Sequence, residues 1–141
     1  MVHGSQQPLP KEEDMKLTGM QVLASFNALS ALARSDVPVL TAYKIAMTLK
    51  ALKDEATTID EIRVKLLDKY GKKDDNGRPI VENNGYVLAD KETFDAEIKV
   101  LFDKETEYAI HPIKMDELGA DIKFSPVLLM ALLEAGLIMK D

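Results

Sequence analysis

The sequence predicts a mainly α-helical protein of three or four helices, with a small β-hairpin inserted between the two longest helices. Three observations favour this fold class: apolar residues recur at three- and four-residue spacing, capping residues precede the apolar stretches, and two Asn-Gly pairs lie close together in one polar segment. A length of 141 residues suits one domain. We expect a flexible tail over residues 1–15 and a single helical domain over residues 16–141, with its hairpin at about 78–89.

The first helix is predicted within "LTGMQVLASFNALSALARS", which is rich in Ala, Leu and Met. One helical face collects its apolar side chains, namely Met20, Leu23, Ala24, Ala28, Ala31 and Leu32. Thr18 is a suitable N-cap. The helix should end near Ser35, because Pro38 disfavours the helical conformation of the residue before it.

The same spacing continues from Val39 to Tyr70. An unbroken helix of this length would measure roughly 48 Å, which is long for a domain of this size. Thr57 and Thr58 weaken helix propensity, and Thr58 with Glu61 fits a capping box. We therefore favour a helix that is bent or interrupted near Thr57 over a straight one.

Two further helices follow. One is expected from Asp90, its N-cap, to Tyr108, and is followed by a short extended segment over 109–113. The other starts at Ser125-Pro126 and ends at Gly136, a favourable residue after a helix. Because this last helix is apolar nearly all round, we expect it to be the most buried element or to lie at an interface.

The segment "KKDDNGRPIVENNGYVLADKE" reads as a turn followed by a hairpin. Residues 80–83 and 86–89 are expected to pair across Asn84-Gly85, a type I′ turn signature. A calcium loop is excluded, because Lys72 and Asn83 would occupy positions that need acidic ligands. A two-stranded hairpin is marginal alone, so Asn84, Gly85 and Tyr86 become candidate contacts with a partner.

The net charge of −6 comes from one segment, because residues 90–121 hold 10 acidic and 4 basic side chains. Asp95, Asp103 and Glu107 are predicted to share the outer face of the helix there, as further candidate partner contacts. Without a basic stripe, nucleic-acid binding is not expected. No membrane span is expected, since Glu134 interrupts the longest apolar run.

No catalytic or metal-binding constellation stands out. The chain has no Cys and two His, and it lacks the Gly-rich phosphate loops and the Gly-x-Ser-x-Gly turn of a nucleophile elbow. His111, between Ile110 and Pro112, is interpreted as a structural histidine. We expect no cofactor, no metal and no enzymatic activity.

The order of the motifs resembles a family of small uncharacterised proteins of tailed phages and prophages. That family shows a "LPVKxAYKIAKNLKxL"-like segment, a "KYGxKDxNGKP"-like turn and a "LSPxxLxAL"-like ending in this order. The matching residues here are Pro38, Ala42, Tyr43, Lys44, Ile45, Ala46, Leu49, Lys69, Tyr70, Gly71, Asp74, Asn76, Gly77, Pro79, Ser125 and Pro126. The resemblance covers about residues 15–137, implies a phage or prophage origin, and carries no catalytic residues.

Two hypotheses for function remain open, with an enzyme built on dispersed carboxylates as a third and weaker one. The first is a non-enzymatic phage-type accessory protein that acts through protein–protein contacts or self-association, as an assembly factor, virion component or adaptor. The alternative is an acidic inhibitor of a host defence or nucleic-acid enzyme, whose acidic face imitates phosphate. Either would act in the cytoplasm of a bacterial host, with the virion as a second location for the first.

Overall fold

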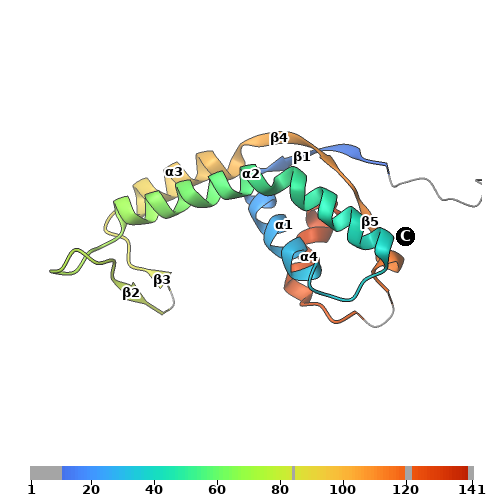
Figure 1. Ribbon diagram of the computed structural model, residues 1–141. Helices are drawn as coiled ribbons and strands as arrows, with labels where there is room; N and C mark the ends of the chain where they lie inside the picture. Colours follow the sequence, from blue (N-terminus) through green and yellow to red (C-terminus); the bar gives the residue numbers. More distant parts are fainter. Residues whose placement is uncertain (1–10, 84, 120–121, 140–141) are drawn as a thin grey trace, which may run out of the picture.

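The computed structural model describes residues 11–83, 85–119 and 122–139, and its shape is elongated. A packed head holds both ends of the described chain, and a narrower arm of two helices projects from it (Figure 1). The longest helix, α2 (Val39–Tyr70), belongs to both parts, because its first half packs in the head and its second half forms one side of the arm.

Helix α2 is continuous over 32 residues, which corrects the break expected near Thr57. Both Thr57 and Thr58 are exposed, so neither side chain meets a packing constraint that would reward a break. The buried positions Leu52, Ala56 and Ile59 continue one helical face through the threonines. Packing of that face against the head therefore outweighs the weak helix propensity of the two β-branched residues.

The arm consists of the second half of α2 and the shorter α3 (Lys91–Asp103), which runs back alongside it (Figure 1). Asp90 caps α3 as predicted: its carboxylate accepts hydrogen bonds from the hydroxyl and the backbone N–H of Thr93, and these hold the pKa of Asp90 below its ordinary value. No residue of α3 is fully buried. Helix α3 contacts α2 along the arm and α1 where the arm meets the head, and its contact side chains are half-buried, so the arm has no core of its own.

The predicted fold class is wrong in its β part: the described chain has four helices, within the number expected, but it contains three separate two-stranded sheets instead of one hairpin. The largest pairs β1 (Glu13–Thr18) with β4 (Glu105–Ile110) in antiparallel register over six residues each. Residues 105–108 were expected to continue the third helix. They form a strand instead, because β1, some ninety residues earlier in the chain, supplies the backbone partners. Strand β1 also begins within the expected tail, whose first ten residues lie outside the described chain.

The expected place of the hairpin is also corrected. The two longest helices are α2 and α1 (Gly19–Leu32), with 32 and 14 residues, and no strand lies between them. The strands β2 (Val81–Glu82) and β3 (Gly85–Tyr86) pair over two residues only, instead of the four expected on each side. Glu82 pairs with Gly85, so the predicted turn over Asn84-Gly85 is displaced by one residue toward Asn83, which has a positive φ of 51°.

The head is built from α1, the start of α2, α4 (Pro126–Ala135) and the remaining strands. β5 (Ile113–Lys114) and β6 (Ile138–Met139) form a short parallel pair, and the 3-10 turn η1 (Met115–Leu118) follows β5. The fully buried apolar side chains of the described chain all lie in the head: Leu17, Val22, Ala28, Leu29, Leu32, Ile45, Leu52, Ala56, Ile59, Ile110, Ile113, Leu118, Leu132, Ala135, Leu137 and Ile138.

Local signals for helix ends are confirmed. Thr18 and Gln21 form a capping box at the start of α1, with hydrogen bonds of 3.1 and 2.9 Å. Pro126 opens α4 and Gly136 closes it in the left-handed conformation, with φ of 82°. Helix α4 is not the most buried element, which was one of its two expected places, because Val127 and Met130 are 75% and 57% exposed. Only one of its faces packs in the head.

Candidate functional site

The chain between α2 and α3, residues 71–90, is the distal segment of the arm. Backbone hydrogen bonds tie it to itself and to α2: Lys72 donates to Val87 at 2.7 Å, Val87 to Ile80 at 2.9 Å, and Ala89 to Tyr70 at 2.7 Å. The hydroxyl of Tyr70 donates to Glu97 of α3 at 2.9 Å. These bonds hold the segment in one conformation although it buries little apolar surface.

The turn at the tip is the one the sequence predicts. Gly77 donates to the carbonyl of Asp74 at 3.0 Å and takes a positive φ of 77°. The carboxylate of Asp74 accepts from the backbone N–H groups of Asn76 and Arg78 at 2.9 and 3.0 Å. Asp74 is thus occupied by its own turn, which agrees with the interpretation of these residues as turn chemistry.

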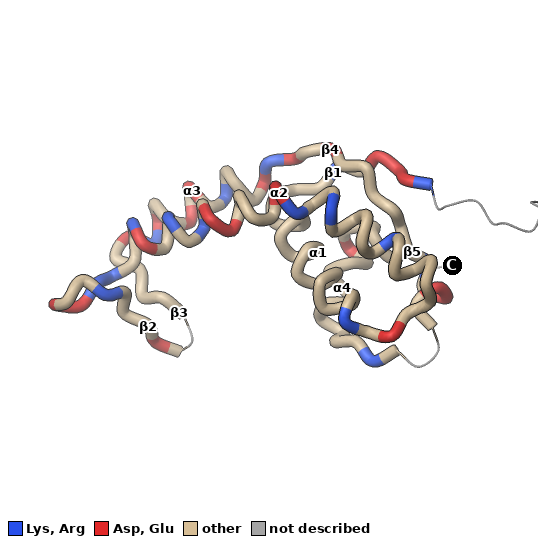
Figure 2. The backbone as a smooth tube through the Cα atoms, viewed as in Figure 1, with Lys and Arg blue, Asp and Glu red and all other residues tan. Residues whose placement is uncertain are grey.

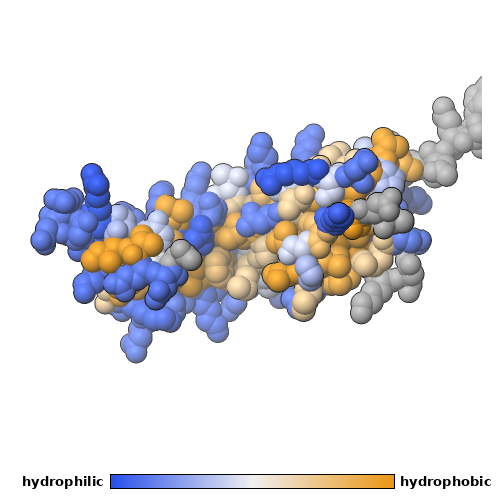
Figure 3. Space-filling model, turned by 90° about the horizontal axis from the view of Figure 1, so that it is seen from below, coloured by the Kyte–Doolittle hydropathy of each residue, from blue (hydrophilic) through white to orange (hydrophobic). Residues whose placement is uncertain are grey.

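Strands β2 and β3 present an exposed apolar pair. Val81 lies opposite Tyr86 in the register, and these side chains are 58% and 48% exposed. Because the neighbouring pair, Ile80 and Val87, makes the backbone hydrogen bond, Val81 and Tyr86 form a non-hydrogen-bonded pair, in which side chains approach most closely. In Figure 3 a hydrophobic patch at this end of the molecule is bordered by hydrophilic residues.

A shallow groove runs beside this pair, between α2 and the distal segment. It has a volume of about 340 Å³, and it is lined by Val64, Lys65, Leu67, Asp68, Pro79 and Tyr86. Val64 is 49% exposed. The carboxylate of Asp68 forms an ion pair with Lys73 Nζ at 3.1 Å. Basic and acidic residues both occur along this end of the arm (Figure 2), and Lys65 and Asp68 line the groove. The groove therefore has an apolar floor and a mixed charged rim, as protein interfaces often have.

Of the three candidate contacts that the sequence predicts in the hairpin, two are described residues and one is not. Tyr86 lines the groove, Gly85 lies in β3 next to it, and Asn84 lies outside the described residues. Sequence reasoning missed Val64, Leu67 and Pro79. The available signal was Val64, an apolar residue outside the buried stripe of α2.

The predicted acidic face is not a single surface. Asp95 and Asp103 lie on α3, but Glu107 lies in β4. The carboxylate of Asp95 forms an ion pair with Lys91 Nζ at 2.6 Å, and that of Asp103 lies 3.6 Å from Lys99 Nζ. Glu107 is opposite Lys16 in the sheet. Each of these carboxylates therefore has a lysine nearby, and the three do not form the unpaired flank that was expected.

The surroundings of His111 are those of a structural histidine. Its side chain is 5% exposed and meets the ring of Tyr43 edge-on, with centroids 5.8 Å apart. Its backbone N–H donates to the hydroxyl of Thr48 at 3.0 Å. Its Nδ1 atom is buried without a hydrogen-bond partner among the described residues, and no nucleophile or carboxylate is recorded in contact with it.

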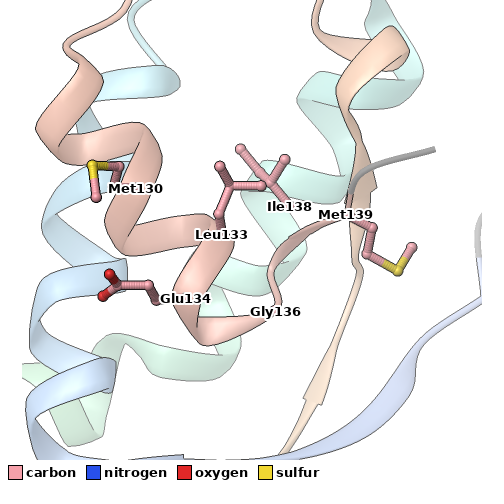
Figure 4. Close-up of a pocket in the computed structure, with 6 residues that line it drawn as sticks. All are labelled: Met130, Leu133, Glu134, Gly136, Ile138 and Met139. Carbon is pink, nitrogen blue, oxygen red and sulfur yellow. The ribbon is translucent and has the colours of Figure 1, made fainter.

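A second and larger hollow lies at the end of α4. It measures about 630 Å³ and is lined by Met130, Leu133, Glu134, Gly136, Ile138 and Met139. Figure 4 shows Leu133 and Ile138 facing each other, with Met130 and Glu134 on the other side of the helix. A small-molecule site needs several polar groups that converge on a ligand, and this lining offers one carboxylate. Met139, one of the lining residues, is also the last described residue of the chain.

Residues 11–83, 85–119 and 122–139 hold no cluster of three or more His, Asp or Glu side chains able to bind a metal ion. In the same residues, no helix combines the length and apolar character that a membrane crossing requires.

Comparisons with known proteins give no relative from which a role could be transferred: no protein-family model, no curated protein and no solved structure matches this chain.

Proposed function

We propose that this chain is a non-catalytic binding protein that contacts a protein partner through the distal end of its arm. The observation that carries the proposal is the exposed pair Val81 and Tyr86 beside an apolar groove, on a segment held in place by backbone hydrogen bonds. Apolar side chains that cluster on a surface mark interaction sites more often than scattered ones do, and neither residue belongs to the core of the head.

The groove suits one apolar side chain of a partner. Tyr86 forms one wall and offers a large rigid surface with a polar end, a residue type that is enriched where interfaces gain most of their affinity. Lys65 and Asp68 at the rim add charges of both signs, which favour orientation over raw affinity.

The resemblance to tailed-phage and prophage proteins leads us to propose a partner encoded by a phage or by its host. Assembly factor, virion component and adaptor are the roles that fit a binding protein of this kind. We therefore propose that it acts in the cytoplasm of a bacterial host or in the virion.

Site-specific photo-crosslinking in cells that express the natural partners tests this function. A photoreactive amino acid placed at Tyr86 should yield one discrete crosslinked protein. The same group at Thr57, an exposed position on α2 away from the groove, is the matched control. The same pattern from both positions, or no crosslink from Tyr86, would contradict the proposal.

A further inference from the structure

The sheet in the head has an open edge on β1. In the described chain, the sheet consists of β1 and β4 only, so each strand has one side that no other strand covers. Strand β1 has six residues, and the last of them, Thr18, also caps α1. Such an edge presents unpaired backbone N–H and C=O groups that can pair with another strand.

The register identifies which residues present these groups. The N–H of Gly19 donates to the carbonyl of Lys104 at 2.9 Å, and Gly19 directly follows the pair of Thr18 with Glu105. Because hydrogen-bonded and non-hydrogen-bonded pairs alternate in an antiparallel ladder, Met15 and Leu17 exchange hydrogen bonds with β4. The backbone groups of Asp14 and Lys16 therefore point to the open side, and both side chains are exposed.

We propose that a second copy of this chain pairs antiparallel with β1 along this edge. In the register that we infer, Asp14 lies opposite Lys16 of the second copy, Lys16 lies opposite its Asp14, and the two Met15 residues face each other on the two-fold axis. Both outward-facing pairs then exchange backbone hydrogen bonds and bring opposite charges together.

Charge selects this register over its neighbours. A shift of two residues in one direction places Asp14 opposite Asp14, and a shift in the other direction places Lys16 opposite Lys16. Like charges directly opposite each other destabilise a strand pair. A shift of one residue places the outward-pointing backbone groups of one β1 strand opposite inward-pointing groups of the other. The backbone hydrogen bonds between the two copies are then lost. A second copy supplies both complementary charges at the spacing that the edge requires, and we therefore assign the edge to self-association.

The dimer would contain one four-stranded antiparallel sheet in the order β4, β1, β1, β4. It would carry two arms, and so two copies of the distal groove. This inference goes beyond the proposed function and is independent of it. Two grooves on one dimer would strengthen binding to a partner that presents several copies of the same site.

Charge exchange tests the pairing in the full chain. Asp14→Lys places a lysine opposite Lys16 of the second copy, and Lys16→Asp places an aspartate opposite its Asp14. Sedimentation velocity over a range of concentrations should show a dimer for the parent chain, at least tenfold weaker dimerisation for each variant alone, and recovery in an equimolar mixture of the two. A parent that stays monomeric throughout, or single variants that dimerise like the parent, would overturn the proposal.

The two variants differ inside the monomer, and this provides a control. Asp14 is opposite Ala109 in the sheet, whereas Lys16 is opposite Glu107, so only Lys16→Asp removes an internal pair of opposite charges. Thermal unfolding of each variant measures that contribution separately. At a protein concentration low enough for the parent to be monomeric, Asp14→Lys should keep the parent's melting temperature, because dimerisation no longer adds to the parent's stability there. Loss of the fold together with the dimer would overturn the assignment for this variant.

The register has its own test, because the chain contains no cysteine. Cα atoms of a hydrogen-bonded antiparallel pair lie roughly 5.5 Å apart, within the range that a disulfide spans. An oxidised mixture of Asp14→Cys and Lys16→Cys should form the mixed disulfide faster than either variant crosslinks with itself. Equal rates, or faster crosslinking of one variant with itself, would overturn this register.

Discussion

The backbone N–H of Gly19 donates a hydrogen bond of 2.9 Å to the carbonyl oxygen of Lys104, which joins the start of α1 to the end of α3. At this point the arm meets the head. The approach is so close that a Cβ atom on Gly19 would overlap the carbonyl oxygen of Leu101. The absence of a side chain at Gly19 therefore allows the arm and the sheet to meet.

Gly19→Ala should destabilise the protein by about 2 kcal/mol, within the range for overpacking a buried site. The backbone of α3 would have to move away, because the atom in conflict is a carbonyl oxygen and not a flexible side chain. Denaturant unfolding measures the loss. Gly85→Ala is the matched control, since the nearest atom to a Cβ there is 3.9 Å away. Equal stability of both variants would contradict the close approach.

The continuity of α2 has a simple test at Thr58. In a continuous helix Thr58 is an exposed interior residue, so Thr58→Ala should raise the free energy of unfolding by about 0.5 kcal/mol through helix propensity. If Thr58 capped a second helix, the same change would lower it by about 1 kcal/mol. Thr18→Ala, at a true N-cap, should show that loss. A Thr58 variant that resembles it would contradict the continuous helix.

The hydroxyl of Thr48 connects α2 to the chain that follows β4. It accepts the backbone N–H of His111 at 3.0 Å, and both residues are buried. Thr48→Val should lower the free energy of unfolding by about 1–3 kcal/mol, because it leaves a buried N–H without a partner. Thr48→Ser keeps the hydroxyl and should lose less. The reverse order in a thermal unfolding experiment would show that packing, and not this hydrogen bond, determines the effect.

Acid should weaken a contact between α2 and η1. Partial burial acts to raise the pKa of Glu117, but hydrogen bonds from Lys44 Nζ and from the N–H of Lys114 outweigh it and hold the pKa below its ordinary value of 4.5. The unfolded chain therefore binds the proton more tightly. The stability from Glu117 is present above pH 4.5 and is lost as the pH falls through the lower folded value.

Glu117→Gln removes this pH-dependent contribution. We expect it to lower the free energy of unfolding by about 1 kcal/mol near neutral pH, with a difference from the parent that shrinks in acid. Denaturant unfolding at several pH values measures the difference. Glu61→Gln removes a charge at an exposed position of α2 and serves as the control. A difference that grows toward low pH would contradict the sign.

The sequence patterns correctly predicted the features that depend on residues close together in the chain. The caps at Thr18 and Asp90, the turn at Asp74 and the end of α4 at Gly136 depend on side chains within a few residues of the backbone that they satisfy. Such interactions form in much the same way in any fold, so the residue types alone predict them.

The sheet of β1 and β4 was missed because its two strands lie far apart in the chain. Alternation was present: Met15 and Leu17 alternate with charged residues, and so do Thr106 and Tyr108. Tyr108 also fitted the helical stripe of the preceding residues, and six residues do not separate the two periods well. The partial burial of the Tyr108 side chain, which raises its pKa, is a consequence of strand pairing that no local pattern contains.

The distal groove depends on a similar long-range arrangement. It forms where the distal segment folds back on α2 and brings Pro79 next to Val64, a contact that no local pattern contains. The sequence did place Tyr86 in an exposed turn-rich segment, and for that reason Tyr86 is the one candidate contact that both lines of reasoning share.

The most direct test of the binding function is the affinity of the purified partner, identified by crosslinking, for two matched variants. Tyr86→Ala removes one wall of the groove, and Val127→Ala removes an apolar side chain on α4 in the head that is still more exposed than Tyr86. Isothermal titration calorimetry should show that Tyr86→Ala raises Kd by about 10- to 100-fold, while Val127→Ala leaves Kd and both melting temperatures near those of the parent. An unchanged Kd for Tyr86→Ala, or an equal loss for Val127→Ala, would contradict a binding site at the distal end of the arm.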